Sequence, residues 1–178
     1  MTDPFSSSVP SAKSPFHLEA LSEAHNRAAF RCGVESLDRY FREQATQDIR
    51  RRMSNCFVAV ERTSGNVAGF YTLATSGVSS TELPPSIIKR LPRYQLIPAI
   101  QLGRLAVDLQ YRGRNVGAGL LADAALRSAR ADAAAFTLLV DAKDESAAAF
   151  YRKHGFEPVA SRPLTLFLPI ATALKLFS

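Results

Sequence analysis

One segment constrains the fold of this chain more than any other. It is an apolar stretch followed by a turn rich in glycine and arginine and then by a helix of small residues. The segment spans residues 102–121 and reads LGRLAVDLQYRGRNVGAGLL. It predicts a strand, a tight turn and a helix, and a helix that starts at such a turn presents backbone amides and its positive dipole end to an anion. Glycine lets the main chain approach a phosphate, and Arg112 and Arg114 add positive charge. The sequence therefore predicts a pyrophosphate site at this turn.

Two common nucleotide-binding motifs do not fit this turn. A P-loop requires Lys followed by Ser or Thr after its last glycine, whereas Ala118 and Gly119 follow Gly117. The dinucleotide fingerprint requires three glycines at another spacing and an acidic residue about 20 positions further on, which cannot be placed here. The ligand therefore belongs to a different class.

A second informative segment spans residues 141–156 and reads DAKDESAAAFYRKHGF. Residues 146–154 are rich in helix formers, and Gly155 stands where a left-handed C-cap is expected. Apolar runs at 136–140 and 156–159 predict strands on either side of this helix. Taken alone, Tyr151 on the helix is most simply a core aromatic residue with its hydroxyl at the rim.

The two segments together resemble motifs A and B of the GNAT acetyltransferases. In motif A, an Arg or Gln is followed by x-x-Gly-x-Gly or Ala: Arg112 takes the first position and Gly117 the last, and Asn115 replaces the usual middle glycine. Asn is among the residues that best accept a positive φ. The resemblance implies that the turn wraps the pyrophosphate of acetyl-CoA and that Tyr151 lies near the cofactor's sulfur. It assigns to acetyl-CoA the residues Leu105, Ala106, Val107, Arg112, Gly113, Arg114, Asn115, Val116, Gly117 and Ala118.

The remaining pattern predicts a single α/β domain over residues 16–178 after a Ser/Pro-rich tail, residues 1–15, that is expected to be disordered. Together with the resemblance, it predicts the GNAT fold, a mixed, mostly antiparallel sheet of six to seven strands flanked by helices. The expected helices are 35–51, a short turn from 84, 116–130 and 146–154. The expected strands are 57–61, 67–76, 99–107, 136–140, 156–159 and 165–168.

Composition excludes several other classes. The 178 residues are 47% hydrophobic, which suits one domain with a substantial core. The chain has no apolar run of membrane-spanning length and no secretory signal, so a cytoplasmic protein without membrane contact is expected. Cys32 and Cys56 are expected to be reduced and half-buried, and the three scattered histidines do not suggest a metal site.

The net charge of +6 is concentrated, because residues 86–117 hold six basic residues against one acidic residue. A polyanionic ligand or partner would account for this excess. The alternative is that the cofactor phosphates account for Arg112 and Arg114 and that the rest is a solvated face. Arg50, Arg51 and Arg52 end the predicted helix 35–51, where they either complement the helix dipole or contact nucleic acid.

The likeness narrows to one subgroup, the TacT-like GNAT toxins of type II toxin–antitoxin modules, and covers the chain from Phe16 onward. The segments that carry it are 30–41 (FRCGVESLDRYF), 44–48 (QATQD), 69–73 (GFYTL), 91–94 (LPRY), 102–108 (LGRLAVD) and 140–144 (VDAKD). The subgroup implies a homodimer that acetylates the α-amino group of aminoacyl-tRNA and blocks translation. It also implies a ribbon-helix-helix antitoxin, and operator DNA bound through that complex. We assign tRNA contacts to Arg50, Arg51, Arg52, Lys89, Arg90 and Arg93.

The resemblance implies direct attack of an amine on the thioester, with the backbone amides of 105–107 polarising the carbonyl and Tyr151 acting as general acid for the thiolate. The strand leading into motif A, residues 100–107, has no acidic residue that could serve as a base. A lysine amine, with a pKa of about 10.4, would need such a base more than an α-amino group with a pKa near 8. The missing acid therefore favours an α-amine, although a water chain or Glu82 could serve.

Two other functions stay open at this stage. One is acetylation of a small amine or a protein amino group, which would proceed without RNA. The other is a role mainly as corepressor within the antitoxin–DNA complex, which would leave motif A and Tyr151 unexplained. A stand-alone RNA-binding module is disfavoured, because no stacking platform of interleaved aromatic residues is present.

Overall fold

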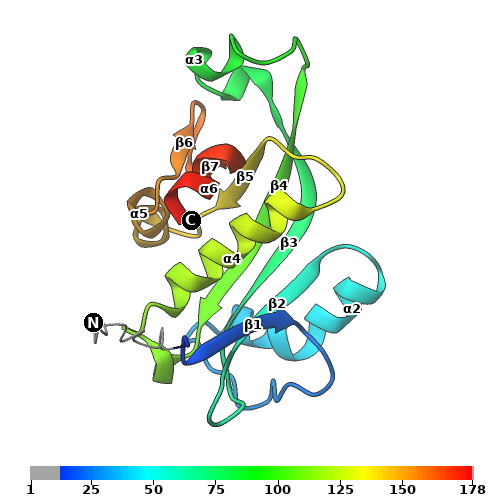
Figure 1. Cartoon of the computed structure of the whole chain (residues 1–178), viewed down its shortest axis with the longest axis vertical. Helices are drawn as coiled ribbons and strands as arrows, with labels where there is room; N and C mark the ends of the chain where they lie inside the picture. The colour runs from blue at the N-terminus through cyan, green and yellow to red at the C-terminus, as the bar shows by residue number, and fades with distance from the viewer. Residues whose placement is uncertain (1–12, 178) are drawn as a thin grey trace, which may run out of the picture.

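Seven strands form one mixed sheet in the computed structural model, which describes residues 13–177 (Figure 1). Their order is β1-β2-β3-β4-β5-β7-β6, and within the described residues β4 and β5 pair in parallel while the other neighbours are antiparallel. The predicted mixed, mostly antiparallel sheet is therefore confirmed. The strands are β1 (Phe16–Ala20), β2 (Asn55–Glu61), β3 (Val67–Ser79), β4 (Leu96–Val107), β5 (Thr137–Asp141), β6 (Glu157–Val159) and β7 (Arg162–Pro169).

The predicted helix over residues 35–51 forms as one stretch with a π-helical turn in its middle. It consists of α1 (Glu35–Arg39), η1 (Tyr40–Gln44) and α2 (Ala45–Arg50). The helix predicted at 116–130 is α4 (Val116–Arg130), and the helix predicted at 146–154 is α5 (Glu145–Lys153). The other elements are α3 (Pro85–Ile88), α6 (Ile170–Phe177), and the short turns η2 (Ser80–Glu82) and η3 (Leu109–Tyr111).

Two elements, β1 and α6, were not predicted. The five residues of β1 form the edge of the sheet and pair with β2, and such a short segment carries little periodic signal. The helix α6 directly follows β7 at Pro169, so that strand and helix read as one apolar run in the sequence. In the fold α6 packs against α4 (Figure 1). β1 extends the sheet at one edge and α6 packs on it beside α4, and neither element lines the cavity.

Three hydrophobic clusters hold the fold together. On one face of the sheet, α4 buries Leu120 and Leu121 against sheet residues such as Leu138. On the opposite face, Phe41 of η1 stacks on Phe70 of β3, with the ring centroids 4.3 Å apart. The third cluster lies under α3, where β3 and β4 extend together beyond the middle of the sheet (Figure 1). The sheet is therefore covered on both faces, and its long hairpin reaches outward.

Several composition-based expectations can be compared with this fold. Cys32 and Cys56 are free, as expected, but the prediction that they are half-buried was wrong, because they are 4% and 2% exposed. Burial raises the pKa of Cys32 to about 11 and that of Cys56 to about 12. In residues 13–177 no helix is long and apolar enough to cross a membrane, and no cluster of His, Cys, Asp and Glu could hold a metal ion. Most of the tail predicted to be disordered, residues 1–12, lies outside the described residues.

Candidate active site

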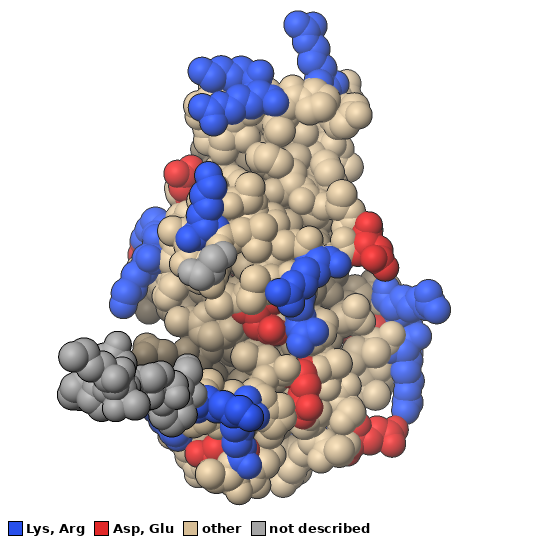
Figure 2. All heavy atoms as spheres, in the orientation of Figure 1, with Lys and Arg blue, Asp and Glu red and all other residues tan. Residues whose placement is uncertain are grey.

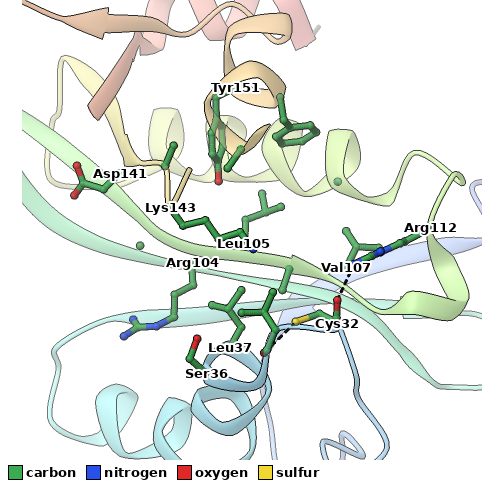
Figure 3. A pocket seen from close by; sticks show the side chains of 17 residues that line it. Cys32, Ser36, Leu37, Arg104, Leu105, Val107, Arg112, Asp141, Lys143 and Tyr151 are labelled. Atoms are coloured by element: carbon green, nitrogen blue, oxygen red, sulfur yellow. Dashed lines mark hydrogen bonds between the residues drawn. The ribbon is translucent and has the colours of Figure 1, made fainter. Parts of the chain in front are cut away.

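The separation of β4 from β5 creates the central cavity. The two strands pair only as far as Leu102 and Val140, whereas β4 continues to Val107. The edge of β4 that faces β5 is therefore free of a strand partner over residues 103–107. These residues line a cavity of about 400 Å³, together with α1 on one side and α5 on the other (Figure 3). Such a free edge offers backbone donors and acceptors to an extended ligand.

A β-bulge in β4 lies at the same place. The register with β3 shifts between Tyr71 and Leu73, so that Gly103 and Arg104 together face Thr72. The buried Thr72 hydroxyl accepts a hydrogen bond from the Arg104 amide at 3.1 Å. A Cβ at position 103 would lie 2.9 Å from that hydroxyl oxygen, so glycine is required for this approach. A bulge of this kind bends the strand and redirects its side chains.

The predicted phosphate turn is left-handed at two positions. Gly113 and Asn115 both have positive φ, 77° and 60°, and α4 starts directly after Asn115. Asn115 therefore adopts the left-handed conformation that glycine accepts most readily. Gly117, in the first turn of α4, lines the cavity, and a Cβ there would lie 3.3 Å from the Phe150 ring. The N-terminus of α4 consequently opens toward the cavity as an anion site.

Asn115 can be tested directly at this turn. We expect Asn115→Gly to change the dissociation constant of acetyl-CoA by less than about threefold, because both residues accept a positive φ. Asn115→Val should weaken binding by roughly tenfold, since a β-branched residue is strained in the left-handed region by ~1–2 kcal/mol. Titration calorimetry with acetyl-CoA measures both variants. Equal weakening by Gly and Val would instead assign the Asn115 side chain to ligand binding.

The two arginines of the turn have different surroundings. Arg112 lines the cavity, and its Nη2 donates a hydrogen bond to the carbonyl oxygen of Cys32 at 2.8 Å. Arg114 lies outside the cavity lining, where it pairs with Glu61 at 3.5 Å and lies over the ring of Phe16. Both lie beside the start of α4, but only Arg112 already faces the ligand space.

Tyr151 occupies the wall opposite the free edge of β4. Its ring meets Phe150 and Phe156 edge-on, at centroid distances of 5.3 and 5.4 Å, and is 8% exposed. Figure 3 shows its hydroxyl directed toward β4, and among the described residues the hydroxyl has no hydrogen-bond partner. Burial raises the pKa of Tyr151 to about 12, so it is a protonated donor throughout the physiological range. Tyr151 is therefore arranged to give a proton or hydrogen bond to a group in the cavity.

Of the ten residues that the sequence assigned to acetyl-CoA, five line the cavity: Leu105, Ala106, Val107, Arg112 and Gly117. The side chain of Ala106 belongs to the cluster on the opposite face, so this residue can offer only its backbone. The other five, Gly113, Arg114, Asn115, Val116 and Ala118, lie in or next to the turn without lining the cavity. The cavity therefore ends beside the turn, at Arg112 and Gly117.

Sequence reasoning missed part of the lining. Ser36 and Leu37 of α1 close one wall, and Arg104, Asp141 and Lys143 add charged groups. Asp141 accepts hydrogen bonds from the Thr165 hydroxyl (2.6 Å) and the Gln101 amide (3.3 Å). These charged residues were visible in the segments 102–108 and 140–144, but only the separation of β4 and β5 reveals that they share a cavity.

Glu82, a candidate base from the sequence, does not line the cavity. It forms an ion pair with Arg162 at 2.5 Å in the outer part of the fold. Asp141 is instead the carboxylate among the residues that line the cavity.

The basic residues assigned to tRNA lie outside the cavity. Arg50, Arg51 and Arg52 are exposed at the end of α2, with Arg50 3.7 Å from Glu23. Lys89, Arg90 and Arg93 are exposed after α3. Figure 2 shows basic side chains gathered at the α3 end and beside α2. The fold therefore separates these two groups from the phosphate turn.

Known proteins with similar sequences identify the family of this chain. The model of the acetyltransferase (GNAT) domain matches residues 52–158. A tRNA-acetylating toxin of Mycobacterium tuberculosis (strain ATCC 25618 / H37Rv) is 36% identical over 158 residues, covering 88% of this chain and 93% of the relative. A probable toxin TacT of Sinorhizobium fredii (strain NBRC 101917 / NGR234) is 32% identical over 161 residues, covering 85% and 89%.

Solved toxin structures have the same fold. AtaT complexed with acetyl-methionyl-tRNAfMet gives a TM-score of 0.82 at 30% identity, covering 92% of this chain and 99% of AtaT. A mutant AtaT bound to the C-terminus of the antitoxin AtaR and acetyl-CoA gives 0.75 at 27%, covering 93% and 99%. The KacTA–DNA complex gives 0.69 at 26%, covering 91% and 98%. The chain therefore belongs to the GNAT family of acetyl-CoA-dependent N-acetyltransferases and is similar along most of its length to the TacT-like toxins.

Proposed function

We propose that this enzyme acetylates the α-amino group of the amino acid on charged tRNA and thereby blocks translation. The observation that supports it most is the cavity in which the Tyr151 hydroxyl faces the free edge of β4, with Arg104 and Asp141 at the end away from Arg112 (Figure 3). Phosphates of acetyl-CoA fit the Arg112 end, beside the start of α4. The opposite end is then left for the acceptor. The similarity to a tRNA-acetylating toxin supports aminoacyl-tRNA as that acceptor.

The chemistry requires little more than these groups. The neutral amine attacks the thioester carbonyl carbon, and a backbone amide of the free β4 edge stabilises the resulting oxyanion. The carbon–sulfur bond then breaks, and the Tyr151 hydroxyl gives its proton to the departing thiolate. The proton lost by the attacking nitrogen goes to water, and Tyr151 regains a proton from solvent. Starting from an ammonium group, the products are an amide, a free thiol and one released proton.

An α-amine suits a site without a strong base. A free α-amino group has a pKa of about 7.7–8.0, and esterification of the neighbouring carboxyl lowers this pKa further. A substantial fraction of the amine is then neutral at physiological pH. Asp141, already fixed by Thr165 and Gln101, can hold the ammonium form near the cavity until a proton is lost. Lysine amines, with a pKa of about 10.4, would be far poorer acceptors.

The partners follow from the same proposal. A ribbon-helix-helix antitoxin neutralises the enzyme, and their complex binds operator DNA. The antitoxin complex of AtaT and the DNA complex of KacTA support an antitoxin and DNA as partners. The active form is a homodimer in the cytoplasm. Arg50, Arg51, Arg52, Lys89, Arg90 and Arg93 contact the tRNA backbone.

The experiment is acetyl transfer from labelled acetyl-CoA to bulk tRNA, either charged or deacylated. We expect label on charged tRNA alone, because deacylated tRNA lacks the amine. Periodate-treated tRNA, which cannot be charged, is the matched control for contaminating amino acids. Label on a small amine or a protein amino group, with none on charged tRNA, would replace the proposal with a generic acetyltransferase.

A further inference from the structure

Arg104 is a cationic residue of the cavity lining. Its guanidinium is held in place by an aromatic ring and makes no hydrogen bond to the described part of the protein. Its guanidinium carbon lies 3.5 Å from the centroid of the Tyr40 ring. The Tyr40 ring is itself fixed, because it is 3% exposed and its hydroxyl donates to Asp48 at 2.8 Å. Within residues 13–177, no carboxylate lies within ion-pair distance of Arg104 and no acceptor satisfies the N–H groups of its guanidinium.

The backbone conformation of β4 at Arg104 also fixes the direction of this side chain. The β-bulge and the hydrogen bond from its amide to Thr72 decide which way the side chain leaves β4. Figure 3 shows the guanidinium and the Asp141 carboxylate directed to the same end of the cavity, away from Arg112 and with Tyr151 between the two ends. The half-buried Arg104 is therefore a pre-positioned anion-binding group on the acceptor side.

The chemistry of this group and that of the acceptor together determine which anion it binds. Guanidinium remains charged at every accessible pH and presents N–H donors in a planar fork that matches phosphate or carboxylate. An amino acid esterified to RNA has no free carboxylate, but the nucleoside that carries it has a phosphodiester at its 5′ oxygen. That phosphate lies only one sugar away from the ester, so it can enter the same cavity as the reacting amine.

We infer that Arg104 binds the phosphodiester of the 3′-terminal nucleotide of the acceptor and so selects amines linked to a nucleotide. This inference rests on the proposed function and specifies its acceptor site. Arg104 also disfavours the binding of other amines. A cationic acceptor such as a polyamine has no phosphate to pair with the guanidinium and is repelled by its positive charge. Asp141, at the same end, faces the ammonium group rather than the phosphate.

The test compares two short acceptors that differ by one phosphate: an aminoacyl-adenosine, and the same nucleoside joined through its 5′ phosphodiester to cytidine. For Arg104→Gln we expect kcat/KM to fall by about 10- to 100-fold with the phosphodiester acceptor, as for loss of a charge-assisted hydrogen bond. With the plain nucleoside it should change by less than about twofold. Arg104→Lys, which keeps a point charge without the fork, should lie between wild type and Gln.

Three controls separate the outcomes. Arg130→Gln removes an exposed arginine at the end of α4 and should affect neither acceptor. The affinity of Arg104→Gln for acetyl-CoA and its melting temperature should match the wild type. Equal losses with both acceptors, no loss with either, or weakened acetyl-CoA binding would overturn the assignment of Arg104. If the wild type fails to acetylate even full-length charged tRNA, the proposed function itself is wrong.

Discussion

Tyr151→Phe is expected to lower kcat for acetyl transfer by roughly 100-fold or more, while the dissociation constant of acetyl-CoA changes by less than about twofold. The substitution removes one oxygen atom and leaves the ring that packs between Phe150 and Phe156. The hydroxyl has no hydrogen-bond partner among the described residues, so its loss leaves no buried group unsatisfied. Single-turnover acetylation of charged tRNA and calorimetric titration with acetyl-CoA measure the two quantities separately.

The pH profile provides a second test of Tyr151. Since its pKa is raised to about 12, the tyrosine stays protonated at neutral pH and the acid form would be lost only as the pH rises toward 12. The wild-type rate should therefore show no falling limb from this group between about pH 6 and 9. Tyr111→Phe is the matched control, because Tyr111 is equally buried but donates to Glu61 outside the cavity. Wild-type turnover in Tyr151→Phe would remove the residue from the mechanism.

Replacing Arg50, Arg51 and Arg52 by Gln together is expected to raise KM for charged tRNA by about 10- to 100-fold and to leave acetyl-CoA binding unchanged. Three lost phosphate contacts should also reduce the slope of log affinity against log salt by about 2–3, because each contact releases a counterion. The three side chains are exposed, and Arg50 has only a long contact with exposed Glu23, so they are available to RNA. Filter binding of charged tRNA between 50 and 200 mM salt, the range over which such contacts change affinity by orders of magnitude, measures the slope.

The competing explanation is that the arginines complement the dipole of the helix that ends at α2. A variant with Gln at Arg130, Lys153 and Lys175 loses the same net charge from other exposed sites and is the matched control. If both triple variants weaken tRNA binding equally, net charge alone is responsible. If the Arg50–Arg52 variant only lowers the melting temperature, dipole complementation explains the three arginines.

The local pattern of the sequence was sufficient for most of the fold, whereas the assignment of residues to the site came from the family resemblance. The boundaries of α4 and the left-handed conformation of Asn115 follow from short-range chemistry, so they could be predicted from the turn itself. The expectation that Tyr151 lies near the cofactor's sulfur came only from the family resemblance, and its place opposite β4 (Figure 3) was not predicted. Arg104 and Asp141 were not predicted as lining residues, because their proximity depends on where a parallel pair of strands separates and where a bulge falls. Neither feature has a signature in one chain's periodicity.

The hydrophobic cluster beneath α3 has a consequence for how such an enzyme can diversify. Val78, Leu83 and Ile97 stabilise the outer hairpin separately from the residues packed around α4, which support the cavity. Substitutions on the outer surface of that hairpin therefore leave the folding of the catalytic half largely unaffected. In evolutionary terms, the exposed surface of the outer hairpin can change at one end of the molecule while selection holds the cavity constant at the other.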